Sequence, residues 1–142
     1  MNRLARGLAT YTDRMKAMGR PVSPHVTQYA FPIAAVSSIT QRVTGVLLSV
    51  GLGGVAAISL AGGDVGALAA SLGSSPAAPA AKFAVAFPLV YHFLGAMRHT
   101  IWDKIPETLE NDKVERSSWA LIGVATVASV GLAAATLPKK KD

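Results

Sequence analysis

The chain has 142 residues, of which 51% are hydrophobic and 15% are charged, against about 25% charged residues in a soluble domain, so the composition favours a membrane protein. Its net charge of +6 comes from basic residues that flank apolar segments, a pattern typical of membrane proteins that gives no reason to expect nucleic-acid binding. Because the chain contains no cysteine, it excludes disulfides, thiolate-bound iron–sulfur clusters and a cysteine nucleophile within itself.

Residues 1–20 form an N-terminal arm in which basic and apolar side chains alternate. This pattern is typical of an amphipathic surface helix or a targeting segment, and it lacks the long apolar core of a secretory signal peptide. We expect a retained amphipathic surface helix. Pro21, Pro24 and Pro32 follow and predict an extended connection, because proline interrupts helical hydrogen bonding. We treat residues 21–142 as one membrane-anchor domain.

Three segments of this domain are apolar enough to cross a bilayer, at about residues 34–62, 79–103 and 117–137. About 20 helical residues, rising roughly 1.5 Å each, span a hydrocarbon core of about 30 Å. The second segment includes Lys82, whose ammonium group is expected to reach the interface. Residues 62–79 and 103–116 are predicted to be loops. The sequence thus predicts an all-α membrane protein with three transmembrane helices and an N-terminal surface helix.

The distribution of lysine and arginine predicts the orientation of these helices. The N-terminal arm and the 103–116 loop fall on the same side and together carry more basic residues than the C-terminal tail, while residues 65–79 carry none. The positive-inside rule therefore places the N-terminus in the cytoplasm or mitochondrial matrix. In the first span, Gly45, Gly51, Gly53 and Gly54 predict close approach of a neighbouring helix.

His92 lies deep in the second predicted span, where an ionisable side chain is costly and needs partners for both ring nitrogens. Three roles remain open: a hydrogen bond to a neighbouring helix, an axial bond to haem iron, or proton relay. His99 follows two helical turns later on nearly the same face and would suit inward-pointing haem propionates. Gly95 and Ala96 leave room for either a flat macrocycle or a close helix.

Ser38 and Arg42 are spaced i, i+4 at the inner end of the first span, so they share one helix face. Arg42 alone is typical of an arginine that reaches lipid headgroups. Together, a hydroxyl and a guanidinium group can hydrogen-bond a carbonyl-bearing ring and stabilise negative charge that develops on it, as quinone reduction requires.

Two sequence runs resemble the signatures of the larger cytochrome b membrane-anchor subunit of succinate dehydrogenase (respiratory complex II). The first comprises Arg20-Pro21-Val22-Ser23-Pro24-His25 followed by Ser38-Ile39-Thr40-Gln41-Arg42-Val43-Thr44-Gly45. The second is His92-Phe93-Leu94-Gly95-Ala96-Met97-Arg98-His99-Thr100-Ile101-Trp102-Asp103. Both occur in the expected order and spans, and the resemblance covers about residues 20–137.

The resemblance implies an anchor that, with a second small membrane subunit, holds a flavoprotein and an iron–sulfur subunit at the inner face of a membrane. It implies that His92 binds the iron of haem b, with the second axial histidine from the partner, and that Ser38 and Arg42 bind ubiquinone. Arg42 and His99 would lie near the haem propionates. Gln41 departs from the pattern, because the family usually has histidine there. The chain would not be an enzyme by itself, and we expect the mitochondrial inner membrane or, alternatively, a bacterial inner membrane.

Three alternatives have different consequences. The chain could anchor a quinol:fumarate reductase, which runs the same chemistry in reverse, or it could be a structural anchor without haem. A small transporter is disfavoured, because the chain has no inverted repeat and no acidic residue within a predicted span.

Overall fold

The computed structural model describes residues 10–21 and 30–135, and in these ranges helices are the only regular elements. The chain divides into two units, Met1–Phe31 and Pro32–Asp142. The first unit contains α2 (Tyr11–Ala17), and the second contains α3 (Ile33–Leu60), α4 (Val65–Ser74), α5 (Ala78–Lys104), the 3₁₀ helix η2 (Pro106–Leu109) and α6 (Asn111–Ala134). The predicted all-α class is confirmed.

Helix α2 begins with a capping box that its sequence explains. The hydroxyl of Thr10 accepts a hydrogen bond from the N–H of Asp13 at 3.3 Å, and the Asp13 carboxylate accepts one from the N–H of Thr10 at 3.1 Å. Hydrogen bonds from the hydroxyl and backbone of Thr10 hold the pKa of Asp13 below its usual value. Residues 1–9 of the predicted arm lie outside the described residues, so its surface placement remains a prediction.

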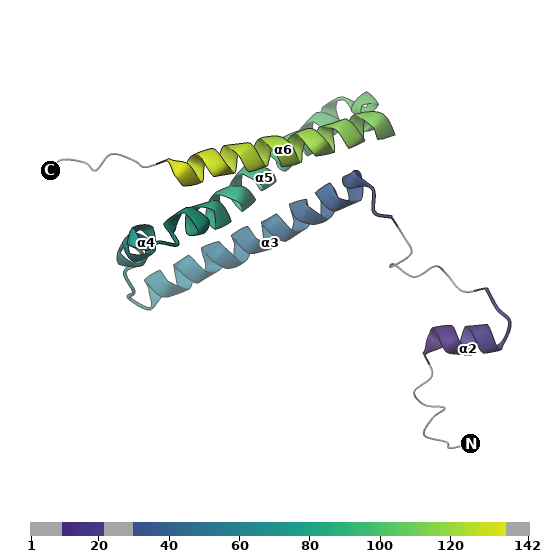
Figure 1. Ribbon diagram of the computed structural model, residues 1–142, viewed down its shortest axis with the longest axis horizontal. Helices are drawn as coiled ribbons and strands as arrows, with labels where there is room; N and C mark the ends of the chain where they lie inside the picture. Colours follow the sequence, from purple (N-terminus) through teal and green to yellow (C-terminus); the bar gives the residue numbers. More distant parts are fainter. Residues whose placement is uncertain (1–9, 22–29, 136–142) are drawn as a thin grey trace, which may run out of the picture. The chain divides into compact units, whose positions relative to one another are not determined.

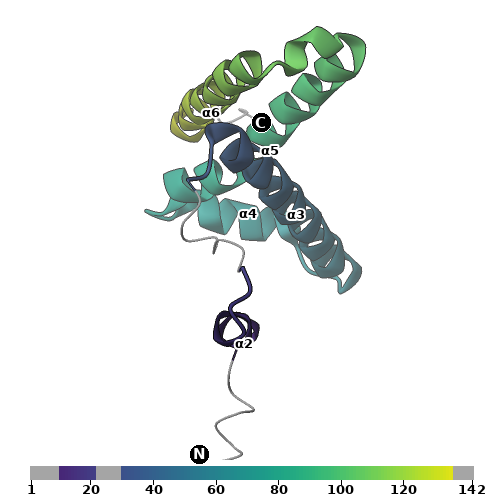
Figure 2. The same cartoon turned by 90° about the vertical axis from the view of Figure 1, so that its right-hand side faces the viewer.

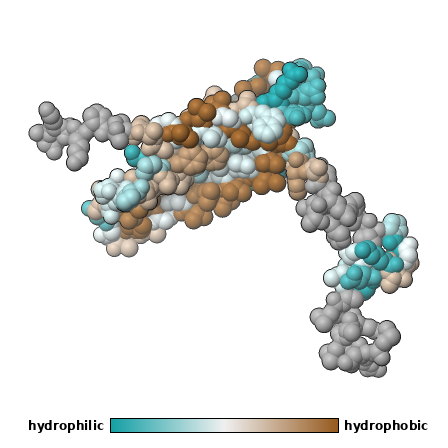
Figure 3. Space-filling model, in the orientation of Figure 1, coloured by the Kyte–Doolittle hydropathy of each residue, from teal (hydrophilic) through white to brown (hydrophobic). Residues whose placement is uncertain are grey.

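Helices α3, α5 and α6 are each long and apolar enough to cross a membrane, which confirms three candidate spans. They lie side by side with successive directions reversed (Figures 1 and 2). Apolar side chains cover much of the visible surface of α3 and α6, while hydrophilic residues gather at the end where α5 meets α6 (Figure 3). This inverted pattern, apolar outside and polar at the ends, is that of a protein solvated by lipid.

The prediction of a loop at residues 62–79 is wrong in part, because α4 occupies Val65–Ser74. Gly62 has a φ of +79° at the end of α3, and Asp64 then caps α4 by accepting a hydrogen bond from the N–H of Ala67 at 2.9 Å. The short alanine- and leucine-containing segment after this cap has helix-forming residues. The glycines and serines of the segment are also typical of a loop, so the sequence alone does not indicate this helix.

The predicted loop at 103–116 is also shorter than expected. Helix α6 begins at Asn111 rather than near residue 117, so its first turns are polar and exposed. Lys113 stabilises this turn through an ion pair with Glu110 at 3.0 Å and a hydrogen bond to the carbonyl of Glu107 at 2.9 Å. The hydropathy of the sequence indicates where the apolar part of α6 begins, and it does not indicate where the helix itself begins.

Helices α5 and α6 pack through a narrow seam of small residues. The buried residues of α6 recur at helical spacing: Ser118, Leu121, Ala125, Ser129 and Ala133. Tyr91 of α5 is fully buried against Leu121 and Ala125. Because small side chains let helix backbones approach closely in lipid, this seam supplies much of the van der Waals contact between α5 and α6.

Helix α3 contacts the bundle mainly along its first half. Its buried residues are Ser37 and Thr44, and a side chain at Gly45 would collide with His92 of α5. A Cβ added at Gly51, Gly53 or Gly54 would meet no other part of the described chain within 4 Å. The glycines predicted close approach of a neighbouring helix; at Gly45 the atoms that approach are those of the His92 side chain, and at the other three no such contact is made by the residues described.

We predict that Ala125→Leu destabilises the detergent-solubilised protein by about 1–3 kcal/mol, the usual cost of adding methylene groups to a tight core. Ala125 is fully buried in the α5–α6 seam. Val127→Leu, at a position 74% exposed, is the control and should leave stability unchanged. Unfolding in a graded SDS titration, followed by circular dichroism, measures both. Equal stability of the two variants would contradict this packing.

Candidate functional site

The imidazole of His92 lies between α5 and α3, and its Nδ1 atom faces α3. This nitrogen is 3.1 Å from the backbone carbonyl of Gln41, 3.3 Å from the Gln41 side-chain nitrogen and 3.4 Å from the Thr44 hydroxyl. Every hydrogen-bond contact of the His92 ring in the described residues is made by Nδ1. The first predicted role, a hydrogen bond to a neighbouring helix, is thus present, and Nε2 is left for another partner.

The side chain of Gln41 crosses from α3 to α5 next to His92. Its Nε2 donates a hydrogen bond to the backbone carbonyl of His92 at 3.0 Å. The amide lies directly over the Cα of Gly95, where an added Cβ would collide with the Gln41 amide oxygen and lie 2.5 Å from its Cδ. In the described residues, the space at Gly95 is occupied by this side chain of α3.

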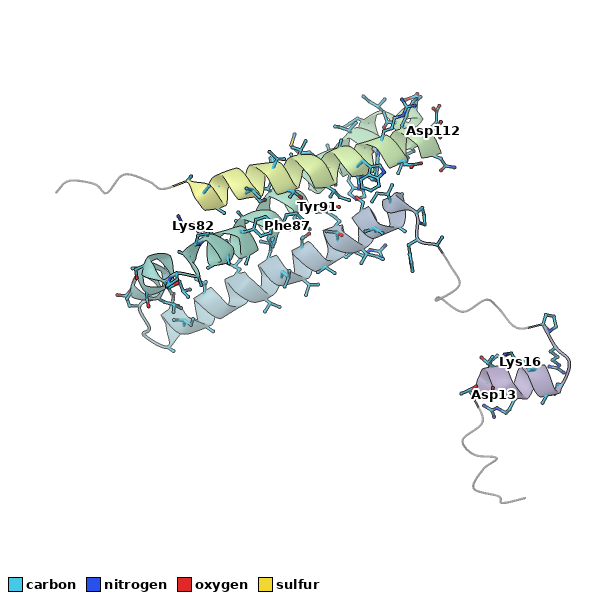
Figure 4. The ribbon with its side chains drawn as sticks, viewed as in Figure 1. Asp13, Lys16, Lys82, Phe87, Tyr91 and Asp112 are labelled. Atoms are coloured by element: carbon cyan, nitrogen blue, oxygen red, sulfur yellow. The ribbon has the colours of Figure 1, made fainter. Side chains whose placement is uncertain are left out.

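A second polar cluster joins all three long helices at the end of the bundle where α3 begins and α5 ends. The hydroxyl of Tyr91 donates to the carbonyl and hydroxyl oxygens of Ser37 at 3.1 and 3.0 Å. Arg98 donates from one terminal nitrogen to Ser37 Oγ at 3.0 Å and from the other to Ser118 Oγ at 2.9 Å. Tyr91 lies where the helices come together (Figure 4). We call Ser37, Tyr91, Arg98 and Ser118 the serine–arginine junction.

The C-terminal end of α5 also carries aromatic contacts. The guanidinium carbon of Arg98 lies 4.5 Å from the centre of the Trp102 ring, within the range of a cation–π interaction. The ring of His99 stands edge-on to Trp102 with centroids 4.9 Å apart. Arg98 is therefore turned into the bundle, whereas His99 is exposed.

Ser38 and Arg42 lie on α3 as their spacing predicted, but outside the serine–arginine junction. Ser38 is half-buried and Arg42 is exposed. The described residues provide no hydrogen bond or ion pair to the side chain of either one. A donor pair of this kind, without partners among the described residues, is open to a ligand or to another subunit.

His92, Ser38 and Arg42 are predicted site residues from the sequence, whereas the serine–arginine junction was not predicted. Ser37 is fully buried while its neighbour Ser38 is not, and a serine doublet does not say which member faces inward. Tyr91 directly precedes His92 in sequence, and its phenol needed a partner in an apolar helix. That requirement was the signal available for finding the junction.

The described residues contain no group of three or more His, Asp or Glu side chains that could enclose a metal ion. This finding concerns sites built from several ligands of one chain. A single axial bond to an iron that is held by a macrocycle needs one free imidazole nitrogen, and His92 Nε2 meets that requirement.

We predict that Ser37→Ala lowers the stability of the protein and that Ser38→Ala does not, although the two serines are adjacent. Ser37→Ala should destabilise the protein by about 1–3 kcal/mol, because it deprives the buried donors of Tyr91 and Arg98 of their shared acceptor. Ser38→Ala should leave stability unchanged. SDS unfolding of both purified variants measures the difference, and loss of stability in Ser38→Ala alone would contradict the assignment of the junction.

Comparison with known proteins gives the family. Residues 16–132 match the family model described as succinate dehydrogenase/fumarate reductase transmembrane subunit. The chain is similar to proteins named succinate dehydrogenase cytochrome b560 subunit, mitochondrial, from Dictyostelium discoideum and Bos taurus. Identity is 41% over 120 residues for the first, covering 82% of this chain and 62% of the relative. For the second it is 36% over 129 residues, covering 87% and 76%.

A bacterial relative is also similar along most of its length. The succinate dehydrogenase cytochrome b556 subunit of Paracoccus denitrificans is 32% identical over 123 residues, which cover 78% of this chain and 87% of the relative. The chain spans less than two thirds of the Dictyostelium protein. The family match covers both predicted signatures, the whole of α3 and α5, and nearly all of α6. The chain belongs to the family of succinate dehydrogenase/fumarate reductase transmembrane subunits.

Proposed function

We propose that the chain is a membrane-anchor subunit of succinate:ubiquinone oxidoreductase that binds b-type haem through His92 and forms part of the quinone-reduction site with Ser38 and Arg42. The observation that carries the proposal is the His92 imidazole, whose Nδ1 faces a backbone carbonyl while Nε2 has no hydrogen-bond partner in the described residues. The relatives are named cytochromes b, and such names are consistent with a haem ligand at this position.

The donor set fits one axial ligand. Metal-binding histidines almost always donate the second ring N–H to a carbonyl, carboxylate or water, which fixes the ring and raises its basicity. The carbonyl of Gln41 is in position to accept from Nδ1. A b-type haem bound there would supply one-electron chemistry between ferric and ferrous iron. We propose that the second axial ligand comes from the partner membrane subunit.

Ser38 and Arg42 supply the donors that quinone reduction needs. Both lie at the inner end of α3, and Arg42 is exposed. Their hydroxyl and guanidinium groups are suited to donate hydrogen bonds to a quinone carbonyl, and the fixed positive charge would stabilise the oxygen as it becomes negative. Arg42 and the exposed His99 are also proposed to lie near the haem propionates.

The proposed partners and location follow from the family. The anchor would hold a flavoprotein and an iron–sulfur subunit, together with a second small membrane subunit. We propose the inner membrane of a mitochondrion or a bacterium, since relatives of both origins are similar, with the N-terminus on the matrix or cytoplasmic side. The family description also names fumarate reductase, but the relatives above carry the succinate dehydrogenase name, which favours succinate oxidation.

We predict that His92→Ala in the assembled complex removes most of the haem, because an axial bond is lost. Thr100→Ala, at an exposed position of the same helix, is the control and should keep haem at its normal content. Pyridine haemochrome assays and reduced-minus-oxidised spectra measure both variants. A normal spectrum in assembled His92→Ala complex would overturn the ligand assignment, and a parent complex without haem would favour a haem-free structural anchor.

We predict that Arg42→Ala lowers succinate–ubiquinone activity by on the order of 100-fold, the scale of losing a donor to a developing charge. Succinate oxidation with a soluble dye should remain, because it does not use the membrane site. Ser38→Ala should show the same split to a smaller degree. Equal loss of both activities would mean that the complex fails to assemble, and unchanged activities would exclude Arg42 from the quinone site.

A further inference from the structure

Two polar side chains cross the α3–α5 interface in opposite directions, and each depends on a glycine of the other helix. Gln41 of α3 lies over Gly95 of α5, and His92 of α5 lies over Gly45 of α3. A Cβ on Gly45 would be 2.8 Å from Cε1 of His92, closer than carbon atoms pack. The imidazole therefore rests on the bare backbone of α3, and the amide rests on the bare backbone of α5.

The neighbours of His92 Nδ1 determine which ring nitrogen carries the proton. The Gln41 carbonyl is an acceptor only. The Thr44 hydroxyl donates its own hydrogen to the carbonyls of Thr40 and Gln41, both at 2.9 Å, so it presents lone pairs to the ring. The Gln41 amide is a donor at 3.3 Å, but one of its two hydrogens is donated at shorter distance to the His92 carbonyl. Because the two oxygens at 3.1 and 3.4 Å both present lone pairs to Nδ1, these contacts are best satisfied when Nδ1 carries the proton and Nε2 keeps its lone pair.

The contact between the Gln41 amide and the His92 carbonyl has an energetic cost. Its Oε1 atom is buried and has no hydrogen-bond partner among the described residues. The oxygen lies against the Cα of Gly95, a contact that offers only a weak C–H···O interaction. A buried, unpaired amide oxygen costs about 1–3 kcal/mol. The contacts that accompany this cost are those with the carbonyl and the ring of His92.

We propose that Gln41 is the positioning residue of His92. It fixes the α5 backbone at His92 through the carbonyl hydrogen bond and thereby sets the direction in which Nε2 presents its lone pair. The proposal rests on the function proposed above, because the direction of Nε2 matters only if His92 binds iron. Gln41 does not itself touch the iron in this proposal, and it acts through the helix that carries the ligand.

The test compares haem in assembled complexes that carry Gln41→Leu, Gln41→Ala or Gly95→Ala. Each variant should bind haem at normal content, because His92 remains, but should shift and broaden the low-spin EPR signal and shift the haem midpoint potential. Gly51→Ala is the matched control, since the added Cβ would meet no other part of the described chain within 4 Å. This variant should leave both measurements unchanged. Subunit content and succinate–dye activity verify assembly.

A double variant separates positioning from general damage. If Gly95 is needed to admit the Gln41 amide, Gly95→Ala should cause no further shift once Gln41→Ala is present. Additive shifts, or unchanged EPR signals and potentials in all three single variants, would overturn the positioning role. Absence of haem from the parent complex would instead overturn the proposed function, so the two failures are distinguishable. Loss of haem from Gln41→Leu together with Gln41→Ala would show a larger role than positioning and would also overturn the proposal.

Discussion

The hydroxyl of Ser37 joins α3 to both other long helices, because it accepts from Tyr91 and from Arg98, and Arg98 in turn bonds Ser118 of α6. Within an apolar medium no water replaces such bonds, so the loss of one leaves a buried donor unpaired. The junction fixes the rotation of α3 and α6 about α5. The seam at Ala125, the placement of Gln41 beside His92 and the outward position of Ser38 all depend on that rotation.

The polar residues of this chain divide by function according to where they lie on their helices. Ser37, Tyr91 and Ser118 are fully buried, and they use their hydrogen-bonding groups within the chain. Ser38 directly follows Ser37 of the junction, and Arg42 lies one helical turn further along α3. Their side chains are left for partners outside the junction. His92 belongs to both groups, because Nδ1 is used for internal contact and Nε2 is available. The structural and proposed functional roles thus meet in one ring.

Much of the architecture could be predicted because lipid permits few polar residues in a span. The exclusion of charge located the three helices, and it made His92 and the Ser38–Arg42 pair conspicuous. The serine–arginine junction could not be predicted in the same way, since sequence spacing does not reveal which of two adjacent serines faces a neighbouring helix. Sequence spacing also does not reveal which glycine faces a neighbouring helix. Four glycines of α3 predicted close approach, and among the described residues only a side chain added at Gly45 would contact another helix. Helix α4 was missed because its glycines and serines resembled those of a loop.

The interleaving of Gln41 with Gly95 and of His92 with Gly45 has a consequence for how this family can vary. Neither glycine is free to gain a side chain alone, because a larger residue there collides with the side chain opposite. A lineage that replaces the amide at position 41 with a smaller side chain gains freedom at position 95, and one that keeps it does not. We therefore expect covariation between α3 and α5 at these positions, independent of any bound cofactor.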